Sequence, residues 1–200
     1  MELRPGFKLT DVGVIPSTWA ERRLGEVATV GSGGTPSRDN PRFWNGAIPW
    51  ITTSQIDFEE ITEADEFITE EGLRSSAAKV LPRGTLLMAL YGQGKTRGKV
   101  AALAIAAATN QACASIAVHP GISSEFLRYF LSLRYEAIRS ASNGGSQDNL
   151  SGQIVKRLTV VVPPLPEQRA IAAALTDVDA LLGALARLIT KKRDLKQAAM

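Results

Sequence analysis

Apolar side chains recur at a regular spacing along the C-terminal stretch, residues 164–200. They follow one another in steps of four and three, which is the alternation typical of a heptad seam. Proline is accepted in the first turn of a helix, so the prolines ahead of the seam predict where the helix begins. The residues predicted to pair with another helix are Ile171, Leu175, Val178, Leu182, Leu185 and Ile189.

A helix over this stretch would be about 50 Å long, at 1.5 Å per residue. The small domain that precedes it cannot cover a rod of that length. We therefore expect the helix to lie along another long helix, from this chain or from a second one. The alternative is a helix that folds back over its own domain.

Residues 1–163 carry short apolar runs separated by polar, glycine-rich turns. Strands are predicted where β-branched and aliphatic residues gather between turn residues, over 48–53, 77–81, 85–90, 99–104, 112–118 and 158–162. Ser123 or Ser124 is predicted to cap a helix whose apolar side runs from Phe126 to Ile138. Short, mostly antiparallel strands with a few helices make an α+β fold, and no internal repeat is visible.

Charge is distributed unevenly, although the formal net charge is only +3. Residues 57–71 hold eight acidic residues and no base, whereas residues 72–124 hold six basic residues and no acid. This asymmetry predicts one positive and one negative face on the domain. A positive face attracts phosphate groups and a negative face repels them.

Several loops carry the side chains that read DNA. Arginine and lysine bind guanine, asparagine and glutamine bind adenine, and serine and threonine bind either base, while loop amides and lysine serve the phosphates. Each such residue can also be an ordinary turn former, so the set argues more strongly than its members. The candidates for base or backbone contact are Thr35, Ser37, Arg38, Thr52, Thr53, Ser54, Tyr91, Gln93, Lys95, Thr96, Arg97, Asn110, Gln111, Ser146, Gln147 and Asn149.

Other chemistries fit the chain poorly. Gly94, Lys95 and Thr96 follow a predicted strand as in a phosphate-binding loop, but Ala89 replaces the first glycine of that motif and Gly98 falls where a helix should begin. One cysteine and one histidine argue against a zinc site or a catalytic triad built by this chain. The chain has no long apolar run and no signal-like start, so we expect a cytoplasmic protein with no membrane segment.

The C-terminal stretch also carries a resemblance. The segments 165–172, 177–181 and 191–197 resemble the conserved spacer helix of specificity subunits of type I restriction–modification enzymes, and the segments 15–27 and 32–53 resemble the opening of their recognition domains. The resemblance implies a target-recognition domain over 1–163 and a spacer helix over 164–200. Family members usually join two such domains and two antiparallel helices, whereas this sequence contains one of each.

The resemblance also implies partners. The chain would be a non-catalytic module that recognises double-stranded DNA and binds no cofactor itself. A methyltransferase subunit would supply S-adenosylmethionine for adenine methylation, and a motor-endonuclease subunit would use ATP and magnesium. The chain could be a natural half-subunit that forms a homodimer through its helix, or a shortened form. The alternative function is a protein–protein adaptor that docks through the helix and does not read DNA.

Overall fold

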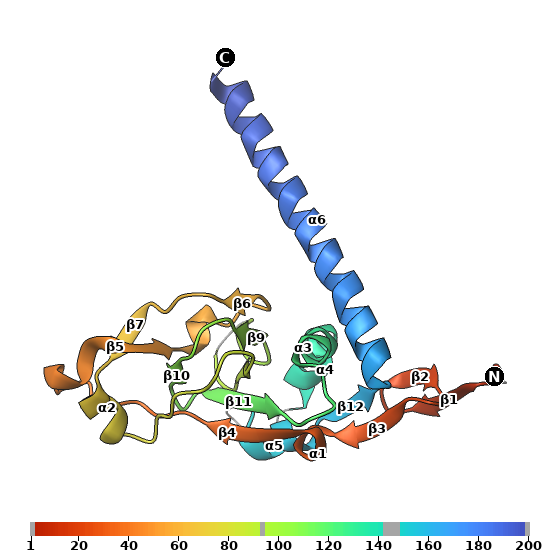
Figure 1. Cartoon of the computed structure of the whole chain (residues 1–200), viewed down its shortest axis with the longest axis horizontal. Helices are drawn as coiled ribbons and strands as arrows, with labels where there is room; N and C mark the ends of the chain where they lie inside the picture. Colours follow the sequence, from red (N-terminus) through yellow and green to blue (C-terminus); the bar gives the residue numbers. More distant parts are fainter. Residues whose placement is uncertain (1–2, 93–94, 142–148, 199–200) are drawn as a thin grey trace.

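A computed structural model describes residues 3–92, 95–141 and 149–198. One long helix projects from a domain of short strands and small helices (Figure 1), so the predicted α+β class is confirmed. The strands are β1 (Phe7–Thr10), β2 (Gly13–Pro16), β3 (Ala20–Arg23), β4 (Ala28–Ser32), β5 (Trp44–Ile51), β6 (Glu60–Ile61), β7 (Glu66–Ile68), β8 (Leu86–Ala89), β9 (Val100–Leu103), β10 (Ala108–Thr109), β11 (Cys113–Val118) and β12 (Thr159–Val162). The helices are α1 (Leu24–Val27), α2 (Glu70–Arg74), α3 (Ser124–Leu133), α4 (Tyr135–Ser140), α5 (Gly152–Arg157) and α6 (Leu165–Ala198), with 3-10 turns η1 (Pro41–Phe43) and η2 (Thr53–Gln55).

The central sheet has the strand order β4-β11-β8-β9-β6, and all its pairs are antiparallel except β9 with β6. Successive residues of a strand point to opposite faces. Leu86 and Met88 of β8 therefore enter one apolar cluster, and Leu87 and Ala89 enter another. A strand that is buried on both faces has apolar residues in succession, without alternation with polar ones. The four residues of β8 show this pattern.

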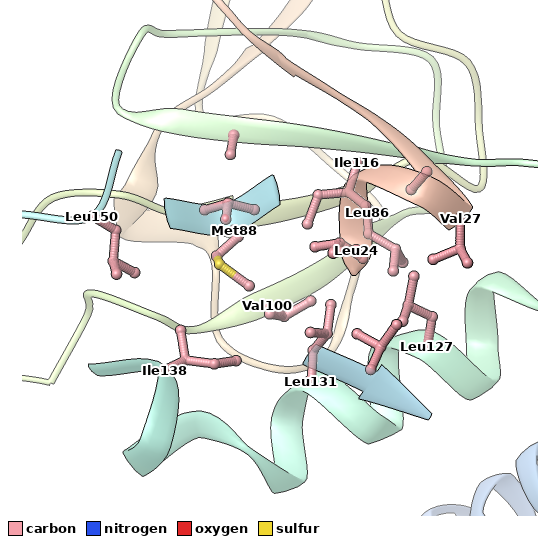
Figure 2. Packing of buried hydrophobic residues seen from close by; sticks show 14 of the residues in the cluster. Leu24, Val27, Leu86, Met88, Val100, Ile116, Leu127, Leu131, Ile138 and Leu150 are labelled. Carbon is pink, nitrogen blue, oxygen red and sulfur yellow. The ribbon is translucent and has the colours of Figure 1, made fainter. Parts of the chain in front are cut away.

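The larger cluster packs the sheet against α1, α3 and α5. Figure 2 shows Leu24, Leu127 and Leu131 within it. Leu24 from α1, Leu127 and Leu131 from α3, and Val155 from α5 are almost completely buried in it. The helices thus cover one face of the sheet and fix the domain around β8 and β11.

A smaller sheet, β10-β5-β7, lies beside the central one. Trp50 is buried, donates from Nε1 to the carbonyl of Gly34 at 3.0 Å, and meets Trp44 edge to face at 5.1 Å. The Trp50 indole therefore fixes the glycine-rich loop after β4 to this sheet.

Side-chain hydrogen bonds fix the start of helix α6 to the domain. Gln168 is 1 % exposed; its Oε1 accepts from the Ser123 amide at 2.8 Å and its Nε2 donates to the carbonyls of Pro163 and Gly121 at 2.8 and 3.2 Å. Trp19 donates from Nε1 to Glu167 at 2.6 Å. The start of α6 is thus tied to the turn between β2 and β3 and to the turn before α3.

Beyond Ala172 every residue of α6 up to Ala198 is exposed except the half-exposed Gly183. The helix projects away from the domain (Figure 1). Tyr129 of α3 contacts it on one side, where the Tyr129 hydroxyl donates to Asp179 at 2.7 Å. The alternative of a helix folded flat over its domain is wrong.

Some local predictions need correction. The strand expected over 48–53 is β5, which begins earlier at Trp44 and ends at Ile51. The helix expected to reach Ile138 breaks at Arg134, so that Ile138 lies in α4. Residues 77–81 form no strand, and only Leu81 makes an isolated bridge, to Ala107. Across the residues with described coordinates, we find no helix with the length and apolar character needed to cross a membrane.

Candidate nucleic-acid interface

The loops rich in candidate residues lie at one edge of the central sheet, where the ends of neighbouring strands meet. Ser32 at the end of β4 pairs with Ala114 near the start of β11, and Cys113 at that start pairs with Ala89 at the end of β8. Because these strands are antiparallel, the loop residues 33–38, 90–92 with 95–98, and 110–112 emerge together. We call these three loops the loop edge.

Hydrogen bonds hold the loop edge together. Thr35 donates from Oγ1 to Oε1 of Gln111 at 2.5 Å, across 76 residues of sequence. The Gly34 amide donates to the carbonyl of Thr109 at 2.8 Å, and Oδ1 of Asn110 accepts from the amide of Ala112 at 3.0 Å. Thr35 is half-buried and Gln111 is exposed, so a side-chain amide is presented from a fixed loop.

The turn after β5, residues 52–54, lies beside the loop edge. Ile51 is the parallel partner of Thr109, and its carbonyl accepts from the amide of Asn110 at 3.1 Å. Thr52, Thr53 and Ser54 therefore follow directly beside Asn110, and Thr52 and Ser54 share a hydroxyl–hydroxyl bond of 2.6 Å.

Arg38 has a different setting. Its guanidinium forms two hydrogen bonds to Glu66 and lies 3.8 Å from the ring centre of Trp44 and 4.9 Å from that of Trp50. Its neighbour Ser37 is exposed and accepts, through its carbonyl, a bond from Trp44 Nε1. These contacts fix Arg38 in the β5–β7 sheet, and a direct DNA contact by it stays a prediction.

The loop after β8 is tied to α4. Tyr135 donates its hydroxyl to the carbonyl of Lys95, and Arg97 donates to the carbonyl of Arg139 at 3.4 Å. Arg97 is half-buried, whereas Tyr91 and Lys95 are exposed. The loop continues through Thr96 into strand β9 and not into a helix, which agrees with the exclusion of a phosphate-binding loop.

Three candidates, Gln93, Ser146 and Gln147, lie outside the described residues. Asn149 is described and half-buried. The amide of the next residue, Leu150, donates to the carbonyl of Leu90 at 3.0 Å. Asn149 therefore lies next to the loop edge.

The predicted separation of charge into two faces is wrong at the central sheet. The acidic strand β6 is the neighbour of β9, and Lys99 forms an ion pair with Asp57 at 2.5 Å. Three acidic residues of 57–71, with two from α3 and α6, line a cleft of about 980 Å³ between α3 and α6. Its acidic lining residues are Asp57, Glu59, Glu60, Glu125 and Asp179. This cleft repels phosphates, so the loop edge is the better surface for DNA.

Among the described residues, no group of three or more histidine, cysteine or carboxylate side chains is placed to hold a metal ion. Burial raises the pKa of the Cys113 thiol to about 12, so the thiol stays protonated and unreactive near neutral pH.

The sequence predicted the seam of α6 only in part. Ile171 packs against the domain, with the cluster that contains Ile15 and Phe126. The other predicted pairing residues are 39 to 58 % exposed. The sequence also predicts that a further column at seven-residue spacing widens one edge of the seam, and its members are exposed as well: Leu181, Leu188 and Leu195.

Comparison with known proteins agrees with these features. The family described as "Type I restriction modification DNA specificity domain" matches residues 16–192. The MjaIX specificity subunit of Methanocaldococcus jannaschii is 30 % identical over 184 residues, and the EcoR124I/EcoR124II specificity subunit of Escherichia coli is 26 % identical over 182 residues; each alignment covers 88 % of this chain.

The fold is also shared with solved structures. The HsdS subunit from Thermoanaerobacter tengcongensis superposes with a TM-score of 0.67 at 20 % identity, over 91 % of this chain and 42 % of that one. The chain spans 41 % and 45 % of the length of the two specificity subunits. From the match over residues 16–192, the chain belongs to the family of type I restriction–modification DNA specificity domains.

Proposed function

We propose that the chain reads double-stranded DNA through its loop edge and directs adenine methylation and restriction by partner subunits. The chain itself supplies recognition and no catalysis. A methyltransferase subunit brings S-adenosylmethionine, and a motor-endonuclease subunit brings ATP and magnesium.

The convergence of the loops carries this proposal. Threonine, serine, asparagine and glutamine side chains from three loops meet at one sheet edge, on a backbone fixed by sheet pairing. Specific recognition requires donors and acceptors held in place, because a base contact is worth only about 1–3 kcal/mol and is lost if ordering the side chain costs as much. Gln111 and Tyr91 are the exposed groups best placed for the DNA grooves.

Helix α6 supports the proposed assembly. Numbering its heptads from Ile171 as position a places apolar residues at a, d and e. A two-helix coiled coil uses columns a and d, whereas three apolar columns are the pattern of a helix in a larger bundle. One partner helix would cover a and d, and a helix of the methyltransferase subunit would cover the e column of Leu175, Leu182 and Ile189.

The charges of α6 favour an antiparallel partner of the same kind. Its first half, residues 165–182, has three acids and one base, and its second half, residues 183–198, has five bases and one acid. A parallel copy would place the two basic ends together, whereas an antiparallel copy places each against an acidic half. We propose that two copies pair in this way and read a palindromic split site.

Copurification with the methyltransferase subunit tests the function. Mapping the methylated adenines should give one target sequence, and Gln111→Ala should reduce its preference over mismatched sites about tenfold or more. Gln153→Ala is the matched control, because Gln153 is also exposed but lies on α5. A complex that forms normally but shows no salt-dependent DNA binding would favour the adaptor function.

A further inference from the structure

Helix α4 contacts the described part of the loop between β8 and β9, residues 90–92 and 95–99, through polar side chains that the proposed function does not use. The helix itself is fixed, because Ile138 is 3 % exposed and packs in the larger apolar cluster (Figure 2). A Cβ at Gly98 would lie 3.2 Å from Cγ of Arg139, so the loop passes close to α4 where it returns to β9. The loop therefore has a rigid support on one side.

The hydroxyl of Tyr135 joins this helix to the main chain of the loop. An arginine side chain can only donate, so the hydroxyl oxygen accepts from Nη1 of Arg139 at 2.6 Å, and its own proton goes to the carbonyl of Lys95. A hydroxyl that accepts from a guanidinium is a stronger donor, because the two bonds polarise one another. Arg97 closes the network by donating to the carbonyl of Arg139 at 3.4 Å. Two points of the loop, Lys95 and Arg97, are thus bonded to α4.

The ring of Tyr135 is held as well, by Phe58. The two rings meet edge to face, with their centres 5.1 Å apart. Phe58 has a φ of 66°, which is rare for a bulky residue, and Arg128 of α3 donates to its carbonyl at 2.6 Å. Backbone strain of this kind persists only where the surrounding structure holds it, and it is concentrated at functional sites. Phe58 is thus kept in an unfavourable conformation that places its ring against Tyr135.

Lys95 is the side chain that this arrangement presents to solvent. A Cβ at Gly92 would lie 2.8 Å from Cβ of Thr96, so Thr96 packs against the other arm of the loop. Arg97 is half-buried and bonded to α4. Lys95 is exposed, and its own carbonyl is the group that Tyr135 holds. The lysine side chain therefore extends from a main chain that is fixed at the same residue.

We propose that Tyr135 is a positioning residue for DNA recognition, which holds the main chain of Lys95 so that the lysine meets the target DNA at a fixed place. The proposal rests on the loop edge as the DNA-reading surface and adds to it a residue of α4. Tyr135 touches no base or phosphate and acts through Lys95. Because the main chain is ordered in advance, less conformational entropy is lost when the specific complex forms. Non-specific binding depends on the charge of Lys95 and not on its position.

Equilibrium binding of two duplexes to the full chain, copurified with the methyltransferase subunit, tests this role. One duplex carries the target mapped from the methylated adenines, and the other differs from it by one base pair. Tyr135→Phe keeps the ring but removes the hydroxyl bond to Lys95. The preference for the target should fall roughly three- to tenfold, whereas the salt dependence of binding should stay the same because no charge changes.

Tyr129→Phe is the matched control. Tyr129 is also half-buried, and its hydroxyl bonds to Asp179 of α6 and not to the loop, so the target preference of this variant should be unchanged. A double-mutant cycle with Lys95→Ala tests the path. In a chain that lacks the lysine side chain, Tyr135→Phe should lower the preference no further. Far-UV circular dichroism confirms that the variants fold.

The outcomes separate this role from the proposed function. If Gln111→Ala and Lys95→Ala both leave the target preference unchanged, the loop edge does not read DNA and both proposals are wrong. If Gln111→Ala lowers the preference but Tyr135→Phe does not, the positioning role alone is wrong. An effect of Tyr135→Phe that persists in full beside Lys95→Ala, or an equal effect of Tyr129→Phe, also overturns the role, because the hydroxyl then acts through something other than Lys95.

Discussion

Gln168 provides the sharpest test of how α6 is held. Its side chain makes three hydrogen bonds at the junction and is 1 % exposed. Gln168→Met keeps an unbranched side chain of similar length but removes both the acceptor and the donors. The Ser123 amide and two carbonyls then lose their partners in a site with little access to water.

The expected loss of stability is about 2–4 kcal/mol. A neutral hydrogen bond contributes roughly 1 kcal/mol, and a buried group left without a partner costs about 1–3 kcal/mol. Regained dispersion contacts of the methionine offset part of this cost.

Urea unfolding followed by tryptophan fluorescence measures the change, since Trp19 lies at the same junction. Gln153→Met, at an exposed position of α5, should change the midpoint little. Nitroxide labels at two exposed positions, Arg83→Cys on the domain and Lys192→Cys on α6, should also show a broader distance distribution in the Gln168→Met background. A loss below about 0.5 kcal/mol, with an unchanged distribution, would mean that the apolar contacts of Ala172 and Ile171 hold the helix without this amide.

Three other changes have defined outcomes. Gly33→Ala places a Cβ 2.0 Å from the carbonyl oxygen of Thr109 and should cost more than about 2 kcal/mol in urea unfolding, whereas Gly152→Ala, with no atom within 4 Å, should be nearly neutral. Cys113 should react with iodoacetamide at pH 8 only after unfolding; because its pKa is raised from 9.0 to about 12, the unfolded thiol ionises first and stability should fall as pH rises between these values. Repeating residues 178–184 once within α6 keeps the heptad phase, adds about 10 Å, and should move the two methylated half-sites apart by about 3 base pairs; an unchanged spacing would refute the antiparallel pairing.

The long helix could be predicted because its signal is local. Heptad spacing, prolines at the start and the lack of an interior proline all lie within one stretch of sequence. The cap of α3 is equally local, and Ser123 Oγ does accept from the amide of Phe126 at 3.2 Å. The break at Arg134 has no such signal, since no proline or glycine stands near it.

The assembly of the loop edge could not be predicted in the same way. Thr35 and Gln111 meet because β11 lies between β4 and β8. This strand order depends on which faces bury the apolar runs, and the residues involved are far apart in sequence. Similarly, the position of Arg38 in a glycine-rich loop predicts a DNA contact. In the structure, its guanidinium instead contacts Glu66 and two tryptophans of the β5–β7 sheet.

In the proposed antiparallel dimer, the distance between the two half-sites would depend on rigid parts of each chain. Strand β11 spans about 20 Å from the loop edge, at Cys113, to the turn before α3, where Gly121 and Ser123 bind Gln168. If Ile171 of one antiparallel copy lies opposite Leu195 of the other, the two Ile171 residues are 24 residues, or about 36 Å, apart along the helices. That distance is close to one turn of B-DNA. A change in the helix register slides the two arms past each other and should therefore shift the spacing of the methylated half-sites, whereas a change at the Gln168 junction alters the tilt of each arm and should broaden the label-to-label distances within one chain.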